Sequence, residues 1–176
     1  MIIWLNGTFG AGKTTTAREL TSRITGSRLF DTEKIGEMLG HVLGPPRRDF
    51  QDWRPWRGLA VETARQLLDD VGGTLVIPQT VLRETYWQEL STGLAEAGIP
   101  VRHFLLHTDQ ETLLHRIRTD TAPESAGARQ WRLDHLPAYR DALPWLRREA
   151  ETLDTTGTPP SRVADTVITR LGRPGR

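Results

Sequence analysis

The chain has 176 residues, of which 37% are hydrophobic and 26% charged, and its formal net charge at pH 7 is +1. These proportions are typical of a soluble globular domain, and the near-zero net charge gives no general attraction to nucleic acid or to acidic membranes. Cysteine is absent, which excludes a disulfide framework and thiolate chemistry. No apolar run approaches the ~20 residues of a membrane span. We therefore expect residues 1–176 to form one domain of a cytoplasmic protein.

The first apolar run, residues 1–5, predicts a buried strand, and residues 7–14 follow it with the sequence Gly-Thr-Phe-Gly-Ala-Gly-Lys-Thr. This is the phosphate-binding P-loop pattern, and the amphipathic pattern after it is typical of a helix. The glycines let backbone N–H groups turn inward around an anion, and the helix adds its positive N-terminal end. We expect Lys13 to reach the β- and γ-phosphates of ATP and the Thr14 hydroxyl to hold Mg²⁺. The nucleotide-binding residues predicted from this motif are Gly7, Thr8, Phe9, Gly10, Ala11, Gly12, Lys13, Thr14 and Thr15.

The position of the lysine strengthens this interpretation of the motif. The chain has 23 lysines and arginines, but the only lysines are Lys13 and Lys34. A compact ammonium therefore stands where phosphate binding needs one, in a chain that elsewhere uses arginine. The alternative is a glycine-rich turn that caps a helix and binds nothing. That alternative does not explain why residue 13 is a lysine in a chain that otherwise uses arginine.

Further apolar runs predict four more strands, at residues 28–31, 74–77, 101–106 and 152–154, with helical patterns between them. Strands that alternate with helices indicate an α/β fold, in which a five-stranded parallel sheet carries helices on both faces. Together with the P-loop, this predicts the three-layer sandwich of a P-loop NTPase. Ligands of such sheets bind at the carboxyl ends of the strands.

A segment dense in arginine, tryptophan and aspartate, residues 47–58, predicts a loop between two helices. The helix before the loop should carry Ile35, Met38, Leu39 and Val42. The helix after it should span about residues 59–71, with an inward side formed by Ala60, Ala64, Leu67, Leu68 and Val71.

The second half of the chain gives further signals for helix ends. Thr108 and Glu111 match a capping box at the start of a helix. Residues 119–130 are polar and predict a mobile loop. The helical pattern after this loop should break near Pro137 and Pro144.

Phosphoryl transfer also needs a group that binds the metal and a group that takes the proton of the acceptor. The usual metal-binding aspartate ends a hydrophobic strand, but the expected strand here, residues 74–77, has no acid after it. Asp31 ends the strand after the P-loop helix, and we expect it to act as general base and as metal ligand. The alternative is that Asp31 only caps a helix beginning at Thr32. Glu33 is a weaker candidate for the same roles.

An arginine should stabilise the charge on the transferring phosphoryl group. We expect the polar segment at about residues 119–132 to act as a lid. Four arginines are candidates for the charge-stabilising role, with Arg116 and Arg118 at the entrance of the segment and Arg129 and Arg132 at its exit. Residues two apart on a helix point in nearly opposite directions, so Arg116 and Arg118 cannot both face the phosphates unless the helix ends between them. We assign Arg116 a catalytic role and Arg118 a nucleotide-binding role, and the alternative for any single arginine is a solvated surface position.

The loop at residues 47–58 interleaves arginine with tryptophan, a pattern that can bind nucleic acid. Asp49 and Asp52 offset the positive charge of these arginines, which argues against nucleic-acid binding. We therefore expect the loop to form a wall around a small acceptor. The alternative is a structural loop anchored by tryptophan. We place the acceptor region at about residues 33–58 and after the third strand. The residues expected to contact the acceptor are Glu33, Asp49, Gln51, Trp56, Arg57, Gln79 and Arg83.

With these residues in view, the chain resembles the P-loop kinases of the nucleoside-monophosphate, shikimate and gluconate kinase type. It is most similar to the TmrB family, which is associated with tunicamycin resistance. The stretches that carry this resemblance are residues 1–14, 31–36, 49–51, 56–57, 75–80 and 111–118.

The resemblance implies a nucleoside-monophosphate-kinase-like fold with a lid, and it makes the missing acid after the third strand a family trait. The resemblance also strengthens the prediction that Asp31 is functional, because related small-molecule kinases place a catalytic or metal-associated carboxylate at this position. The segment 154–157, which includes Thr156, is similar to the loop that lies beside adenine in several such kinases.

Two features depart from the family pattern. Asp120 stands where a further lid arginine is expected, and the chain ends soon after its last core helix, without the longer tail that could attach such a protein to a membrane. We therefore expect a soluble protein without a membrane span, with ATP and Mg²⁺ as cofactors, a small molecule as its partner and no nucleic-acid partner. A monomer and a homodimer both stay open.

The leading hypothesis is an ATP-dependent phosphotransferase acting on an alcohol group of a small molecule, with a nucleoside-type or sugar-containing antibiotic as a candidate acceptor. One alternative is an ATP-binding resistance protein that sequesters the drug without chemistry. Another is a nucleoside, nucleotide or sugar kinase of primary metabolism. A regulatory GTPase is excluded, because its Asn-Lys-x-Asp motif needs an asparagine and the only one in the chain is Asn6.

Overall fold

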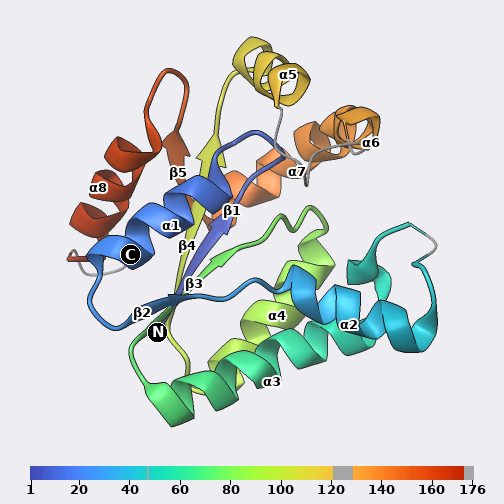
Figure 1. Cartoon of the computed structure of the whole chain (residues 1–176), viewed down its shortest axis with the longest axis vertical. Coiled ribbons are helices and arrows are strands. Elements are labelled where there is room, and N and C mark those ends of the chain that lie inside the picture. Colours follow the sequence, from blue (N-terminus) through green and yellow to red (C-terminus); the bar gives the residue numbers. More distant parts are fainter. Residues whose placement is uncertain (47, 121–128, 173–176) are drawn as a thin grey trace.

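The computed structural model describes residues 1–46, 48–120 and 129–172. Five parallel strands form one sheet in the order β2-β3-β1-β4-β5, with helices on both faces (Figure 1). The strands are β1 (Ile2–Asn6), β2 (Ser27–Leu29), β3 (Thr74–Pro78), β4 (Val101–His107) and β5 (Glu151–Asp154). The predicted α/β architecture of a P-loop NTPase is therefore confirmed.

The helices cover both faces of the sheet because strand side chains alternate between them. Ile3 and Leu5 of β1 point to the face covered by α1 and α8, whereas Ile2 and Trp4 point to the face covered by α2, α3, α4 and α7. All of β1 is buried for this reason. The helices that the structure describes are α1 (Lys13–Arg23), α2 (Glu33–Leu43), α3 (Arg54–Val71), α4 (Glu84–Glu96), α5 (Gln110–Thr119), α6 (Arg129–Asp134), α7 (Leu136–Glu149) and α8 (Pro160–Leu171), and a short 3-10 helix, η1 (Phe50–Asp52), precedes α3.

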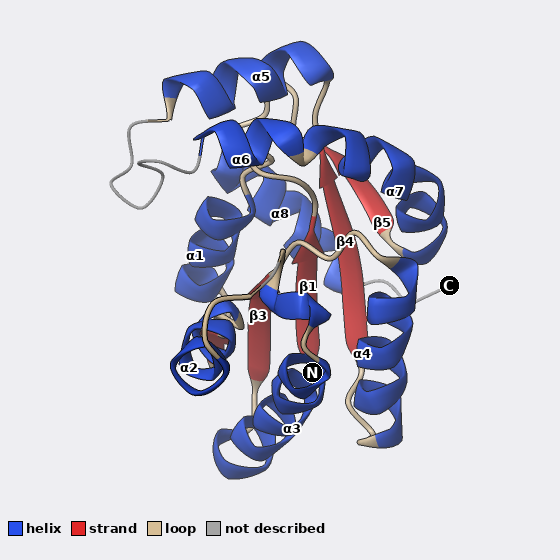
Figure 2. Cartoon of the chain, turned by 90° about the vertical axis from the view of Figure 1, so that its right-hand side faces the viewer, coloured by secondary structure: helices blue, strands red, loops and turns tan. Residues whose placement is uncertain are grey.

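The middle strand determines where a ligand can bind. β1 pairs with β3 on one side and with β4 on the other, so the order of the strands reverses there. In open parallel sheets, ligands bind outside the carboxyl ends of the strands at such a point. The P-loop follows β1 at this place, and Figure 2 shows α5 and α6 above the carboxyl ends of the strands.

The start of α3 differs from the sequence-based prediction. The helix begins at Arg54, so the prediction that residues 54–58 belong to the preceding loop is wrong. Pro55 lies in the first turn of the helix, where its missing N–H is not needed and its fixed φ suits the helix. Val71, predicted to face inward, is exposed at the other end of α3.

Other helix ends also differ. Asp109, not Thr108, caps α5, because its side chain accepts from the backbone N–H of Thr112 at 2.8 Å. The helical segment does break just before Pro137, where α6 and α7 meet, but α7 continues through Pro144. Residues 129–130, expected in a mobile loop, begin α6. Residues 121–128 of the predicted lid and Arg47 of the predicted loop lie outside the described residues.

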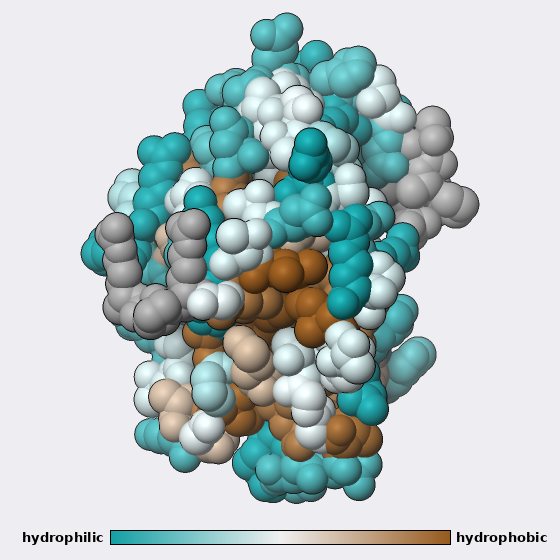
Figure 3. Space-filling view, turned by 90° about the vertical axis from the view of Figure 1, so that its left-hand side faces the viewer, coloured by the Kyte–Doolittle hydropathy of each residue, from teal (hydrophilic) through white to brown (hydrophobic). Residues whose placement is uncertain are grey.

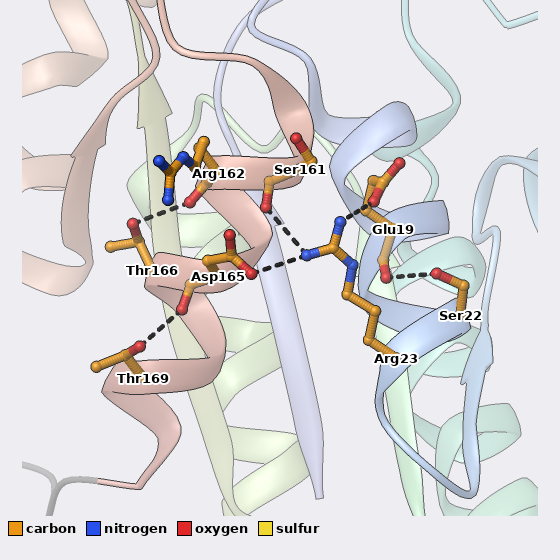
Figure 4. A network of polar contacts seen from close by, with 8 residues as sticks. All are labelled: Glu19, Ser22, Arg23, Ser161, Arg162, Asp165, Thr166 and Thr169. Atoms are coloured by element: carbon orange, nitrogen blue, oxygen red, sulfur yellow. Dashed lines mark hydrogen bonds and ion pairs between the residues drawn. The ribbon is translucent and has the colours of Figure 1, made fainter.

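A polar cluster centred on Arg23 joins α1 to α8 (Figure 4). Nη1 of Arg23 donates to Oδ1 of Asp165 at 2.8 Å and to the carbonyl oxygen of Ser161 at 3.3 Å, and Nη2 pairs with Glu19. Each exposed ion pair of this kind contributes about 0.2–1 kcal/mol. Apolar packing therefore holds the two helices on the sheet, and the cluster adds a polar link between them.

Some large apolar side chains remain at the surface of α2. Met38, Val42 and Leu43 are exposed, whereas Ile35 and Leu39 on the same helix are buried. On a different side of the molecule, at the left of Figure 1, Figure 3 shows hydrophobic surface surrounded by hydrophilic residues. No helix in the described part of the chain is long and apolar enough to cross a membrane.

Candidate functional site

A cleft of about 1440 Å³ opens at the carboxyl ends of the strands. Its wall has two parts, which we name after the sequence-based predictions for them. One part, the nucleotide half, comes from residues 9–16, Arg116, Asp120, Arg132 and the loop after β5. The other part, the acceptor half, comes from lining residues within 31–37, 48–52 and 78–86, with Trp131, His135 and Ala138. The predicted site residues that line the cleft are Phe9, Gly10, Ala11, Gly12, Lys13, Thr14, Thr15, Asp31, Glu33, Asp49, Gln51, Gln79, Arg83 and Arg116. Those that the structure places elsewhere are Gly7, Thr8, Trp56, Arg57, Arg118 and Thr156.

The P-loop follows a path that only glycine permits at its start. At Gly7, φ is +135°, and an added Cβ would lie 2.4 Å from the carbonyl oxygen of Leu106 in β4. Gly10 and Gly12 also have positive φ, at 80° and 92°. The side chain of Asn6 accepts from the N–H of Gly7 at 2.8 Å. These conformations are the kind that turn backbone N–H groups toward an anion, so the loop fits a phosphate.

Lys13 lies folded over the loop that precedes it. Its Nζ donates to the carbonyl oxygens of Gly7 and Thr8, at 2.9 Å each, and lies 5.6 Å from the ring centroid of Phe9. Burial lowers the pKa of Lys13 from 10.5 to about 8, while Glu33 raises it and Arg132 lowers it further. The ammonium is thus held in a half-buried place beside the phosphate-binding loop.

Asp31 takes part in a local cap and also lines the cleft. Its Oδ1 accepts from the N–H of Glu33 at 3.0 Å, so the capping alternative describes one of its oxygens. Thr14 is exposed at the start of α1. A hydroxyl and a carboxylate suit Mg²⁺, which keeps several waters and uses few protein ligands beside phosphates. The described residues contain no group of three or more His, Cys, Asp or Glu side chains that could hold a metal ion.

Buried polar contacts hold the acceptor half in shape. Oε1 of Gln79 accepts from the hydroxyl of Thr32 at 2.8 Å, and Trp56 donates to the carbonyl oxygen of Thr32 at 2.9 Å. Nε2 of Gln51 donates to the carbonyl oxygen of Thr80 at 2.8 Å. These bonds tie η1 and the start of α2 to the loop after β3, so three segments far apart in sequence form one wall.

Trp56 and Arg57 lie behind this wall, so their predicted contact with the acceptor is not what the structure shows. Trp56 is fully buried, and Arg57 pairs with Glu89 on α4, with 2.6 Å between Nε and Oε2. Nη1 of Arg57 also donates to the carbonyl oxygen of Gln51. The reason is the early start of α3, which turns both side chains away from the cleft and toward the core. The Trp-anchored structural loop, weighed from sequence as the alternative, describes them better.

The arginines around the predicted lid fall into two groups. Arg116 donates to the carbonyl oxygens of Gly10 at 3.2 Å and Thr155 at 2.9 Å, while Arg118 is exposed and does not line the cleft. Arg132 lines the cleft and pairs with Asp120 at 2.7 Å, whereas Arg129 is exposed. As the helical spacing predicts, Arg116 and Arg118 do not face the same side.

Comparison with known families decides the family. A model of an AAA domain family matches residues 2–136. The chain belongs to this AAA domain family. Comparison with curated proteins gives no sequence match.

Solved structures show how far the likeness of this AAA domain extends. The Deinococcus radiodurans tunicamycin resistance protein is 26% identical, with a TM-score of 0.72 over 98% of this chain and 96% of that one. A sugar kinase from Janibacter sp. HTCC2649 is 20% identical, with a TM-score of 0.68 over 97% and 93%. The Mycobacterium tuberculosis APS kinase CysC, in complex with AMPPNP and APS, is 19% identical, with a TM-score of 0.65 over 98% and 97%. The expected resemblance to the tunicamycin resistance family and to P-loop kinases is confirmed.

An aromatic cluster in the cleft of this AAA domain was missed from sequence. The rings of Phe9 and Trp131 lie edge to face with centroids 4.9 Å apart, and the centroid of His135 lies 3.9 Å from that of Trp131. The spacing of Trp131 and His135, four residues apart near the end of a helical pattern, was the available signal. Their contact with the P-loop could not be predicted from the sequence, because it forms only when the chain is folded.

Thr156 lies beside the cleft and supports the loop after β5. Its hydroxyl accepts from the N–H of Asp109 at 3.0 Å and contacts the hydroxyl of Thr108. Thr155 and Gly157, its neighbours, line the cleft instead. The predicted loop therefore reaches the site through the residues on either side of Thr156.

Two carboxyl groups of the acceptor half have raised pKa values. Burial is the main cause of the raised pKa of Glu33, with Asp31 adding to it and Lys13 opposing it. Burial also raises the pKa of Asp49, against the hydrogen bond from Gln51, which lowers it. Burial disfavours the charged form of a carboxyl group, so both groups are easier to protonate than exposed ones.

Proposed function

We propose that this protein is an ATP- and Mg²⁺-dependent phosphotransferase that moves the γ-phosphoryl group of ATP to an alcohol group of a small molecule. The observation that carries the proposal is that Lys13 of the P-loop and Asp31 of the acceptor half line the same open cleft. The fold likeness to the APS kinase in complex with AMPPNP and to the sugar kinase supports it.

In this proposal the P-loop binds the phosphates, and Lys13 turns from the loop carbonyls to the β- and γ-phosphate oxygens. The acceptor hydroxyl oxygen forms a bond to the γ-phosphorus, the bond from that phosphorus to the β–γ bridging oxygen breaks, and ADP leaves with the electron pair. The hydroxyl proton goes to the carboxylate of Asp31. Mg²⁺, held by Thr14 and Asp31, would neutralise charge on the phosphates, and Arg116 or Arg132 would add positive charge beside them.

For the acceptor, we propose a nucleoside-type or sugar-containing antibiotic, which would give the protein a resistance function in the cytoplasm, where ATP is available. The likeness to the tunicamycin resistance protein supports this choice. The sugar kinase, which is similar in fold, supports a kinase of primary metabolism as the alternative.

The test is ATP turnover with candidate acceptors, comparing wild type with Lys13→Ala and Asp31→Asn. We expect Lys13→Ala to lower kcat/KM by about 10³-fold and Asp31→Asn by about 10²-fold, because the first loses phosphate charge stabilisation and the second loses the base and weakens a metal ligand. Asparagine keeps the oxygen that accepts from the N–H of Glu33. Arg65→Ala is the control, since Arg65 lies on α3, pairs with Glu62 and Asp69, and does not line the cleft.

The proposal fails if both site variants phosphorylate the acceptor at the wild-type rate. Phosphorus NMR separates the remaining alternative. A drug that binds in the presence of ATP without forming a phosphorylated product would identify a sequestering protein.

A further inference from the structure

His135 lines the acceptor half at the junction of α6 and α7. Its ring is held by two aromatic neighbours, with its centroid 3.9 Å from Trp131 and 6.3 Å from Phe9. Phe9 belongs to the P-loop, so the imidazole is fixed relative to the phosphate-binding backbone. The proposed reaction gives this side chain no role.

The hydrogen bond at Nδ1 determines which nitrogen of His135 is available. Nδ1 lies 2.6 Å from the carbonyl oxygen of Trp131, which can only accept. Nδ1 therefore carries the hydrogen, and in the neutral ring Nε2 keeps its lone pair. Because His135 lines the cleft, its Nε2 is the ring nitrogen left to accept a hydrogen bond from a bound molecule.

Asp49 is the second polar group of this subsite. Its Oδ1 accepts from the N–H of Gln51 at 2.8 Å, and Asp49 lines the same cleft as His135. The bond to Gln51 fixes the carboxyl at the start of η1 and leaves Oδ2 for a ligand. A carboxyl and an imidazole nitrogen that share one cleft wall are partners for hydroxyl groups.

The acceptor half is also acidic, which bears on the charge of its ligand. Two of its ion pairs are Lys34 with Glu37 at 2.7 Å and Arg83 with Asp52 at 3.4 Å. Its described lining residues carry more carboxylates than cations, with a formal balance of −2: Asp31, Glu33, Glu37, Asp49 and Asp52 against Lys34, Arg48 and Arg83. Like charges brought together in an interface disfavour the wrong partner, so this half disfavours an anionic acceptor.

We propose that the acceptor half binds an uncharged, hydroxyl-rich molecule, with one hydroxyl donating to Nε2 of His135 and another hydrogen-bonded to Asp49. This inference rests on the proposed phosphotransferase function and names the acceptor class for it. Asp31 stays the proposed base, and His135 is a residue that binds and orients the acceptor. A sugar acid or a phosphate ester meets the negative charge of Asp49 and Glu33 at the same place.

The test uses neutral probes, each paired with an anionic analogue: D-glucose with D-gluconate, and uridine with uridine 5′-monophosphate. Binding is measured by thermal shift with AMPPNP and Mg²⁺ present, and phosphorylation with ATP. We expect at least one neutral probe to bind, with an affinity at least about tenfold above that of its anionic partner. A preference for the anionic members, or binding of no neutral probe while AMPPNP binds, overturns the inference.

Two variants of His135 separate acceptor binding from a packing role. His135→Phe keeps the ring against Trp131 but has no nitrogen, and it should raise the acceptor KM about tenfold. His135→Gln supplies a side-chain oxygen without the ring and should keep the acceptor KM within about threefold of wild type. The KM for ATP should not change in either variant.

The reverse pattern, with His135→Phe native and His135→Gln impaired, would show a packing role and overturn the inference. Failure of the proposed function is distinguishable, because it appears as loss of AMPPNP binding or as no phosphorylated product from any acceptor. Product formed only from anionic probes overturns the acceptor class alone.

Discussion

The two halves of the cleft are built in different ways. The nucleotide half is built mainly on one continuous segment, the P-loop at residues 7–15, whose shape depends on glycine φ angles and on backbone groups, while Arg116, Arg132 and the loop after β5 lie around it. The acceptor half is assembled from side chains of four segments that are far apart in sequence, and contacts such as Thr32 to Gln79 hold them together. A backbone site is therefore sensitive to an added Cβ, whereas a side-chain site is sensitive to loss of the polar groups behind its wall.

The largest effect is expected from Gly7→Ala, which tests the backbone half. The new Cβ would lie 2.4 Å from the carbonyl oxygen of Leu106 at a φ of +135°. We expect the free energy of unfolding to fall by about 3 kcal/mol, with ATP binding lost, because strain and a steric clash add. Gly98→Ala is the control, since Gly98 has a φ of +68° with open space around it and should cost about 1 kcal/mol. Equal losses in urea denaturation would show that the close approach to β4 has no effect.

Arg57→Met tests the side-chain half. Arg57 has a side chain that is 9% exposed, and its guanidinium bonds Glu89 and the carbonyl oxygen of Gln51. Removing it should lower the free energy of unfolding by about 2 kcal/mol, measured by urea denaturation, and leave the KM for ATP unchanged. Arg83→Met, at a side chain that is 56% exposed, should change stability by less than about 0.5 kcal/mol. A raised acceptor KM without loss of stability in Arg57→Met would restore the prediction made from sequence.

The same contrast explains what the sequence could predict. The P-loop was predictable because its function depends on residues adjacent in the chain, and the sheet because each strand is a short apolar run bounded by turns. Trp56 and Arg57 were assigned to the cleft because nothing local distinguishes a tryptophan in a loop from one in the first turn of a helix. Pro55 was the signal for the earlier start of α3.

His135 was missed for a different reason. A local pattern reveals its spacing from Trp131, but its contact with Phe9 links residues far apart in the chain. The raised pKa values of Glu33 and Asp49 likewise come mainly from burial, which sequence spacing does not report. A site made of such long-range contacts is visible only after the chain is folded.

Arg116→Met and Arg118→Met test how α5 supports the nucleotide half. Arg116 bonds the carbonyl oxygens of Gly10 and Thr155, so its removal frees the P-loop from the loop after β5. We expect the Kd for ATP, measured by isothermal titration calorimetry, to rise about tenfold. Arg118→Met should bind ATP as wild type does, because Arg118 is exposed away from the cleft. Equal weakening by both variants would mean that their positive charge acts at long range and not through these bonds.

The smallest effect is expected in the pH dependence of stability, through Lys13. Burial lowers the pKa of Lys13 to about 8 in the folded protein, against 10.5 for the ordinary side chain. Between these values the unfolded chain holds a proton that the folded protein has released, so raising the pH favours the folded state. The free energy of unfolding of wild type should therefore rise relative to Lys13→Met between pH 8 and 10, by on the order of 1 kcal/mol.

Lys34→Met is the control for this measurement. The hydrogen bond to Glu37 raises the pKa of Lys34, so its contribution to stability is fully present below pH 10.5 and is lost only above it. The stability of Lys34→Met should thus stay parallel to that of wild type from pH 8 to 10, without bound nucleotide. If Lys13→Met also stays parallel, the ammonium of Lys13 is hydrated in the folded protein and the P-loop does not bury it. The phosphate site of the nucleotide half would then be formed by backbone groups alone. The difference from the acceptor half, which is formed by side chains, would be larger still.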